Sequence, residues 1–194
     1  MNTFRYVIAT VVMVSLPPGL LMWFVVHPFA PFWRRMGTRW AYTILSGGML
    51  LMMIGTYVVR DVLLATDLGT NVLTMVLAIP CVAIAVVIGS KRKRYLTFRI
   101  LVGVPEVSET SQRGALLTEG PYAVIRHPRY VEATFAVLGY ALVANYVGTY
   151  VLFFACITAI YLIVILEERE LRDRFGEEYD AYCRAVPRFL PQSR

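Results

Sequence analysis

Three stretches of this chain are long, apolar and free of charge, and they constrain its fold more than any other feature. Residues 7–26, 41–59 and 72–89 each approach the roughly 20 residues that cross the hydrocarbon core of a bilayer as a helix. Of the 194 residues, 58% are hydrophobic and only 16% are charged, which is unusual for a soluble domain. The sequence therefore predicts an all-α integral membrane protein.

A fourth apolar stretch, residues 131–166, is too long for one span. As a single helix it would measure about 54 Å, against a hydrocarbon core about 30 Å thick. Asn145 and Gly148 inside it are turn residues, so we expect a helical hairpin that turns at 145–148. Its arms should be shorter than usual or partly sunk among other helices. The prediction is about five transmembrane helices, the last two forming the hairpin.

Basic residues are distributed unevenly around these spans. If the N-terminus lies outside, all of the 19 Lys and Arg residues except Arg5 and Arg60 fall on the cytoplasmic side. The net charge of +6 and the pI near 9.4 are therefore assigned to lipid head groups and topology, and not to nucleic acid. The basic run 91–94 is interpreted as a stop-transfer signal in preference to a specific site.

The chain divides into two regions on this reading. Residues 1–90 form the N-terminal transmembrane helices, with three spans. Residues 91–194 form a catalytic region that contains the cytoplasmic loop, the hairpin and a C-terminal helical tail, and the loop and tail together hold the polar residues. We expect the chemistry of the protein in these two polar segments.

Cysteine and histidine usage argues against a metal site or a disulfide framework. Cys81, Cys156 and Cys183 are widely spaced and odd in number, and His27 and His127 are the two histidines of the chain. We therefore expect no metal. The sequence also lacks the Gly-rich phosphate loop, HExxH, CxxC and GxSxG motifs, so ATP hydrolysis and zinc proteolysis have no basis in it.

The loop ends in an unusual sequence just before the hairpin, Arg126-His127-Pro128-Arg129-Tyr130. Pro128 suits the first turn of a helix and biases the preceding residue toward an extended backbone. Arg126 and His127 then stand at a helix N-terminus, where free amides and the helix dipole favour an anion such as a carboxylate or a phosphate. A lipid head-group anchor is an equally good interpretation of these residues alone.

Two adjacent acids, Glu167 and Glu168, close the predicted fifth span. Acids at that depth are costly without a partner, and a carboxylate at a helix C-terminus opposes the helix dipole. The placement calls for a cation, which Arg126 or a bound ligand would supply, unless both acids simply lie in interfacial water. Glu132 is a further isolated acid, and the sequence assigns it no role.

The tail shows the spacing of one helical face. The apolar and aromatic residues of that face are Leu171, Phe175, Tyr179, Tyr182 and Val186. The pattern favours an amphipathic helix lying on the membrane surface. Gly176 is expected to interrupt this helix and Pro187 to end it.

The loop end and the tail together resemble the isoprenylcysteine carboxyl methyltransferase family and its relatives among membrane phospholipid methyltransferases. The matching residues are Leu116-Leu117, Gly120-Pro121-Tyr122, Arg126-His127-Pro128, Tyr130, Glu167-Glu168, Leu171, Phe175-Gly176, Tyr179, Tyr182, Val186-Pro187-Arg188 and Pro191. The order and spacing of so many positions make the match specific. The resemblance covers the C-terminal part of the chain, and the first 90 residues offer only hydropathy.

The resemblance implies that S-adenosyl-L-methionine is the methyl donor and that S-adenosyl-L-homocysteine is released. It also implies a cofactor pocket built from the loop end and the tail. Its residues would be Gly114, Ala115, Leu116 and Leu117 beside the adenosine, Tyr122 as an aromatic wall, His127, Pro128, Arg129 and Tyr130 around the amino acid part, and Glu167 as a polar contact. A carboxylate site at the helix N-terminus agrees with this assignment.

Two positions depart from the family pattern. Glu132 stands where the family often has a glycine, and Ile163 stands where eukaryotic members can carry an arginine. If that arginine holds the carboxylate of the substrate, Arg126 or Arg188 must take its place in this protein.

The function implied is methyl transfer to the C-terminal carboxylate of a prenylated cysteine peptide or protein, at the cytoplasmic face of a multi-pass membrane protein. A carboxylate is already ionised at pH 7, so this reaction needs no general base. The nearest alternative is N-methylation of a phospholipid amine, which does need a base, and Glu168 or Glu132 would serve. A non-catalytic protein that binds membrane lipid is the alternative from a different class.

Overall fold

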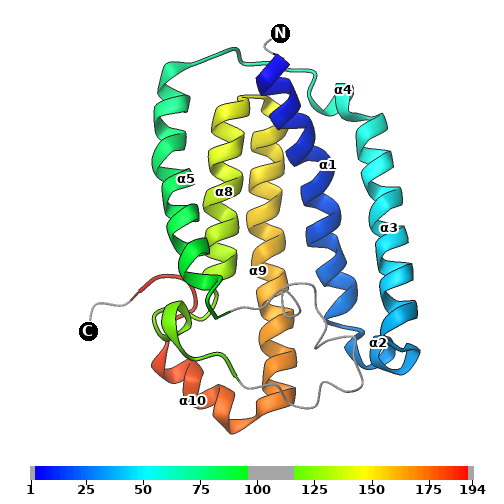
Figure 1. The fold of residues 1–194 in the computed structure, drawn as a ribbon, viewed down its shortest axis with the longest axis vertical. Coiled ribbons are helices and arrows are strands. Elements are labelled where there is room, and N and C mark those ends of the chain that lie inside the picture. The colour runs from blue at the N-terminus through cyan, green and yellow to red at the C-terminus, as the bar shows by residue number, and fades with distance from the viewer. Residues whose placement is uncertain (1–2, 96–115, 192–194) are drawn as a thin grey trace.

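The computed structural model describes residues 3–95 and 116–191, and this part of the chain is a bundle of helices (Figure 1). The long helices are α1 (Thr3–Val26), α3 (Thr38–Val58), α5 (Val72–Arg92), α8 (Pro128–Ala144) and α9 (Val147–Phe175). The short ones are α2 (Ala30–Met36), α4 (Arg60–Leu63), the 3-10 helix η1 (Gly120–Ala123) and α10 (Glu177–Ala185). The described residues contain no β-strand, so the predicted all-α fold is confirmed.

Four helices, α1, α3, α5 and α9, are long and apolar enough to cross a membrane. This confirms a multi-pass membrane protein, although the sequence predicted about five spans. The difference lies in α8, which has 17 residues and so measures about 25 Å. This helix nevertheless lies inside the bundle and packs against α1, α5 and α9 (Figure 1). It is the short, partly sunk arm of the predicted hairpin.

The hairpin turn between α8 and α9 lies where the sequence predicted it. Asn145 has a left-handed backbone with a φ of 55°, a conformation that asparagine adopts more readily than most residues. Its side-chain amide donates to the carbonyl oxygen of Gly69 at 2.9 Å, and its side-chain oxygen accepts from the hydroxyl of Tyr150 at 2.8 Å. The turn is thereby tied to the connection between α4 and α5.

The second arm of the hairpin is longer than expected. α9 runs unbroken for 29 residues to Phe175, so the expectation that Glu167 and Glu168 close a helix is wrong. The residues that follow them are good helix formers without Gly or Pro, and α9 continues for about two more turns. Gly176 ends α9 with a φ of 59° and a ψ of −128°, backbone angles that side chains disfavour. The predicted break at Gly176 is confirmed.

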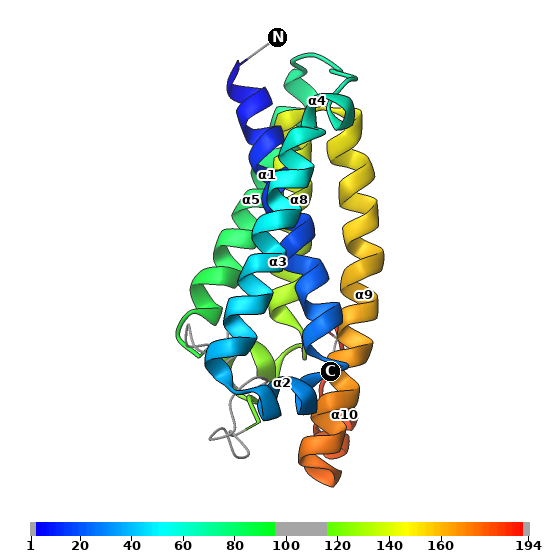
Figure 2. The same cartoon turned by 90° about the vertical axis from the view of Figure 1, so that its right-hand side faces the viewer.

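The sequence analysis expected the apolar face of the tail helix to lie on the membrane surface. In the structure, the apolar face of α10 packs against protein instead. Tyr179, Tyr182 and Val186 are buried in a cluster against Leu116 and the last turns of α9. The expectation failed because a helical apolar face has the same pattern whether it covers lipid or protein. Figure 2 shows α10 and the lower end of α9 extending beyond the ends of the other spans.

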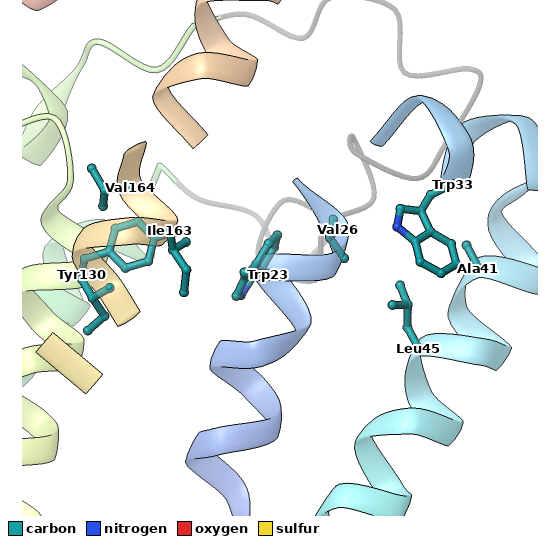
Figure 3. Close-up of a cluster of buried hydrophobic side chains, with 9 residues drawn as sticks. Trp23, Val26, Trp33, Ala41, Leu45, Tyr130, Ile163 and Val164 are labelled. Atoms are coloured by element: carbon teal, nitrogen blue, oxygen red, sulfur yellow. The ribbon is translucent and has the colours of Figure 1, made fainter. Parts of the chain in front are cut away.

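A core of nine buried residues lies at the same end of the bundle. It joins α1, α2, α3, α8 and α9 through Trp23, Val26, Trp33, Ala41, Leu45, Tyr130, Ile160, Ile163 and Val164 (Figure 3). Ile163 is fully buried there, with 0% of its surface exposed. An arginine at this position would place an unpaired charge in an apolar cluster, which is costly. Residue 163 is therefore part of the apolar core in this chain.

Candidate functional site

The carboxylate of Glu168 in α9 is the centre of a buried ion-pair cluster. Its Oε1 accepts from Nη2 of Arg126 at 3.1 Å, from Nε2 of His127 at 3.0 Å and from Nε of Arg188 at 3.0 Å. Its Oε2 accepts from Nη2 of Arg188 at 2.6 Å. The structure thus brings together the three residues that the sequence analysis named for catalysis, with His127 beside them. A carboxylate that already accepts this many charged donors has little capacity to take up a proton.

The loop end and the C-terminal segment are also joined through their backbones. The amide of Arg126 donates to the carbonyl oxygen of Pro187 at 2.8 Å, and the amide of His127 donates to that of Arg188 at 3.1 Å. His127 precedes the first residue of α8, as predicted. These two amides are therefore not open to a ligand, because they hold the returning C-terminal segment in place.

Arg126 links the end of α10 to α9. Its Nη1 donates to the carbonyl oxygens of Cys183 at 2.8 Å and Val186 at 3.1 Å, which lie at the C-terminal end of α10. A guanidinium suits this position because the last carbonyls of a helix lack partners within the helix. Arg126 therefore supports the architecture of the site, with only its single Nε–H buried and unpartnered among the described residues.

Glu167 differs from its neighbour Glu168 in having an unsatisfied carboxylate oxygen. Its Oε2 is buried and accepts no hydrogen bond from any described residue. Nδ1 of His127 lies 3.9 Å from this oxygen, which is too long for a hydrogen bond. Because Nε2 of His127 donates to Glu168, the ring is fixed with Nδ1 on the side of Glu167. The pair leaves an acceptor open to a donor from a ligand.

Tyr122 in η1 forms a buried aromatic wall beside these groups. Its side chain is 9% exposed overall, and its carbonyl oxygen accepts from the hydroxyl of Tyr182 at 2.6 Å. Burial raises the pKa of Tyr122 to about 12. The positive charge of Arg92 lowers this pKa, and the negative charge of Glu167 raises it. The phenol stays neutral at pH 7, and charged groups from α5 and α9 surround it.

The remaining residues predicted for the cofactor pocket fall into four groups. Arg129 lies with its guanidinium carbon 4.9 Å from the ring centroid of Trp23 in α1, a cation–π contact. Tyr130 and Pro128 are buried, and the Tyr130 ring packs 5.8 Å from that of His127. Leu116 and Leu117 are half-buried, and Leu116 packs against the α10 cluster. Gly114 and Ala115 lie outside the described residues.

A second ion pair near Tyr122 was missed by the sequence analysis. Arg92, in the last turn of α5, is bidentate on Glu132 of α8, with Nε to Oε2 at 2.6 Å and Nη2 to Oε1 at 3.2 Å. The interpretation of Arg92 as part of a surface stop-transfer run is wrong, because this residue is only 7% exposed. The signal was the isolated Glu132, since an acid near an apolar stretch needs a cation. The run of four basic residues hid which one would supply it.

A third cluster links α1 and α2 to the extension of α9. Nδ1 of His27 lies 2.7 Å from Oε2 of Glu170, and Nη2 of Arg34 donates to Oε1 at 3.1 Å. The ring of Trp23 stacks on His27 at 5.0 Å. This cluster anchors the N-terminal helices to the same end of the bundle as the site, and no motif in the sequence had indicated it.

Comparisons with known proteins identify the family of this chain. The sequence profile of the phospholipid methyltransferase family matches residues 73–178, more than half of the chain. The nickel-cobalt-cadmium resistance protein NccN of Alcaligenes xylosoxydans xylosoxydans is 31% identical over 77 residues, which is 40% of this chain and 36% of that protein. The match thus spans about a third of that relative. No solved structure gives a significant match. The family match includes nearly all of α5, all of α8 and α9, and Arg126, His127 and Glu168, and the chain therefore belongs to the phospholipid methyltransferase family.

Proposed function

We propose that this protein methylates the C-terminal carboxylate of a prenylated cysteine, with S-adenosyl-L-methionine as donor, at the interface of membrane and cytosol. We choose a carboxylate as the methyl acceptor because of the ion pairs that Glu168 and Glu132 form. Both are held by arginine in bidentate ion pairs. N-methylation of an amine needs a group that accepts a proton, whereas a carboxylate needs none. The occupation of both candidate bases favours the carboxylate acceptor.

The open acceptor on Glu167 fits the donor molecule. S-adenosyl-L-methionine carries an ammonium group and ribose hydroxyls, and either would satisfy the buried Oε2 that no described residue reaches. Tyr122 offers a buried, neutral aromatic face next to it. We therefore assign Glu167, His127 and Tyr122 to the donor. When bound, the donor supplies a sulfonium methyl group, which a carboxylate oxygen takes with its lone pair as the C–S bond breaks and its electrons return to sulfur.

The residues of the chain align the reacting groups and exclude water from them. No proton moves when a carboxylate displaces a neutral thioether, so acceleration depends on holding oxygen, methyl carbon and sulfur in line and on removing water from the carboxylate. The Glu168 cluster fixes His127 and the C-terminal segment as one unit. The tyrosines of α10 are buried against Leu116 and the last turns of α9, next to this unit.

The membrane location of the protein suits a lipid substrate. The spans expose many large apolar side chains, among them Leu51, Ile79 and Val86. A prenyl chain can therefore remain in the bilayer, where each buried CH₂ contributes about 0.8 kcal/mol. The Lys and Arg residues concentrate at the end of the bundle that carries the site, which supports a cytoplasmic orientation of that end.

N-methylation of a phospholipid remains the second candidate for a specific reason. Glu167 keeps an unpaired carboxylate oxygen, so it is the one acid of the site that is free to act as a base. The two functions predict different products, an ester or an amine.

The test is transfer of labelled methyl groups by the purified protein in liposomes. S-farnesylcysteine and phosphatidylethanolamine are supplied in parallel as acceptors. Alkali-labile label on the cysteine supports the proposal, and alkali-stable label on the phospholipid supports the second candidate instead. Failure to transfer to either acceptor, together with failure to bind S-adenosyl-L-homocysteine, would overturn both.

A variant pair separates the binding role of Glu167 from a general effect of charge. Glu167→Gln should weaken binding of S-adenosyl-L-homocysteine about tenfold or more, because the amide replaces an ionic contact with a neutral one. Glu178→Gln is the matched control, since Glu178 is exposed on α10. Equal binding by the two variants would remove Glu167 from the donor site.

A further inference from the structure

Arg92 has a buried hydrogen-bonding group that the ion pair with Glu132 does not use. Nε and Nη2 face the carboxylate, whereas Nη1 is buried and has no hydrogen-bond partner in residues 3–95 and 116–191. The side chain of Arg92 is 9% exposed. Buried polar groups are almost always paired, so a group of this kind calls for an explanation.

The surroundings of Arg92 place it at the edge of the candidate site. α5 packs against η1, which contains Tyr122, and the charge of Arg92 acts on the Tyr122 phenol. Glu167, with its own unpaired oxygen, acts on the same phenol from α9. An unpaired donor and an unpaired acceptor therefore lie around one aromatic side chain.

Arg92 also lies at the depth where a lipid head group enters. It is the last residue of α5, whose outer face exposes Ile79, Val86 and Val87, and Lys93 and Arg94 beyond it are exposed. Among the described residues α5 packs mainly against α8 and η1, which leaves its other side facing the bilayer. Because Nη1 is buried, a lipid anion that approaches along this side reaches it only when neighbouring side chains move.

The ion pair with Glu132 holds the guanidinium in a fixed direction. Gly89, one turn earlier on α5, makes room for this arrangement, because a Cβ there would lie 2.6 Å from Oε1 of Glu132. Arg126 and Arg188, which the sequence analysis considered for the substrate carboxylate, both donate to Glu168. Arg92 is the arginine of the described site whose terminal nitrogen is both buried and unpaired.

We propose that Nη1 of Arg92 binds the anionic group of the lipid substrate, a carboxylate or a phosphate, at the membrane edge of the methyl-transfer site. This rests on the function proposed above and assigns the anion-binding residue that Ile163 cannot supply. Glu132 acts as a positioning residue, since it orients the guanidinium and neutralises its charge when no lipid is bound.

The experiment compares lipid pairs that differ in the anion alone. N-acetyl-S-farnesylcysteine is measured against its methyl ester, and phosphatidic acid against diacylglycerol, by quenching of tryptophan fluorescence in detergent. We expect the wild-type protein to prefer the anionic member of one pair about tenfold, which is the effect of one charge-assisted hydrogen bond. The pair that shows the preference identifies carboxylate or phosphate.

Arg92→Lys is the test variant, because lysine can still pair with Glu132 but has no second terminal nitrogen. It should lose the preference while keeping the wild-type affinity for S-adenosyl-L-homocysteine. Arg94→Lys makes the same change at an exposed position two residues away and should keep the preference. If Arg92→Lys is unstable, Arg92→Gln combined with Glu132→Gln removes both charges together and should also lose the preference.

Three results would overturn the inference. These are no preference in the wild-type protein, an unchanged preference in Arg92→Lys, or a loss of S-adenosyl-L-homocysteine affinity equal to the loss for the lipid. Methyl transfer measured in parallel separates this inference from the proposed function. Wild-type transfer with an unchanged preference in Arg92→Lys would refute only the role of Arg92. Arg92-dependent lipid binding without transfer to any acceptor would refute only the methyltransferase activity.

Discussion

Arg188 meets Glu168 side-on, with Nη2 2.6 Å from Oε2 and Nε 3.0 Å from Oε1. This ion pair joins the segment after α10, which contains Arg188, to α9. α9 begins at the opposite end of the bundle. Because Glu168 also accepts from Arg126 and His127, its carboxylate holds together the loop end, α9 and the tail. Loss of this single negative charge should therefore affect the whole site.

Glu168→Gln should destabilise the folded protein by about 3 to 5 kcal/mol, because it leaves buried cations without their counter-charge. Thermal unfolding of the detergent-solubilised protein measures the effect. Glu178→Gln, on the exposed surface of α10, should change stability by less than about 0.5 kcal/mol. Similar melting temperatures for the two variants would show that the cluster does not support the fold.

Tyr182→Phe should destabilise the site by about 1 to 3 kcal/mol, because it leaves the buried carbonyl oxygen of Tyr122 without its donor. The phenyl ring keeps the packing of α10, so the loss comes from the hydrogen bond alone. We expect weaker binding of S-adenosyl-L-homocysteine with little change in the rest of the fold. Calorimetric binding by the variant at wild-type affinity would contradict this role of Tyr182.

Gly89→Ala should destabilise the protein by about 1 to 3 kcal/mol. The added Cβ would meet Oε1 of Glu132 at 2.6 Å, and that carboxylate cannot move away without breaking its contacts with Arg92. Gly48→Ala in α3 is the control, because no atom lies within 4 Å of a Cβ there. Alanine is the better helix former, so Gly48→Ala should leave stability unchanged or raise it by up to about 1 kcal/mol. A greater loss in Gly48→Ala than in Gly89→Ala would contradict the close approach of α5 and Glu132.

Asp67 should make the stability of the opposite end of the bundle depend on pH. The backbone amide of Gly69 and the guanidinium of Arg5 lower the pKa of Asp67 below its ordinary value of 3.8, against the effect of burial. A lowered pKa stabilises the folded state fully above pH 3.8, and this contribution is lost as the pH falls through the folded-state pKa.

The comparison of wild-type protein with Asp67→Asn isolates this effect from other acids. The wild-type protein should be more stable than the variant at pH 6, and the difference should shrink as the pH falls below 3.8. Unfolding by denaturant at a series of pH values measures it. A difference that stays constant with pH would show that the Asp67 carboxylate is not preferentially ionised in the folded protein.

The far end of the bundle shows what hydropathy could not reveal. Arg5 was simply one of the two basic residues left outside by the topology, yet it is 1% exposed and donates to the carbonyl oxygens of Ala144 and Asn145 and to Asp67. These partners lie 62 to 140 residues away along the chain. No periodic pattern connects such positions, so only folding brings them together.

Local chemistry determined the elements of this protein. Charge-free apolar stretches predicted the spans, Asn145 predicted the hairpin turn, Gly176 predicted the break before α10, and Pro128 predicted the start of α8, because each acts on the backbone near its own position. The spacing around His127 and Glu168 also identified the family, since those residues keep a fixed order along the chain.

The tertiary structure decided the partners of the charged residues. Whether Glu168 is a base or a structural anchor depends on Arg188 and Arg126 lying within hydrogen-bond distance, and whether Arg92 pairs with Glu132 or lies exposed at the surface depends on how α5 packs on α8. An ion pair forms at a few ångströms between residues that are far apart in the chain, and its strength depends on burial. Distance and burial are properties of the packed bundle, and the order of residues alone does not contain them.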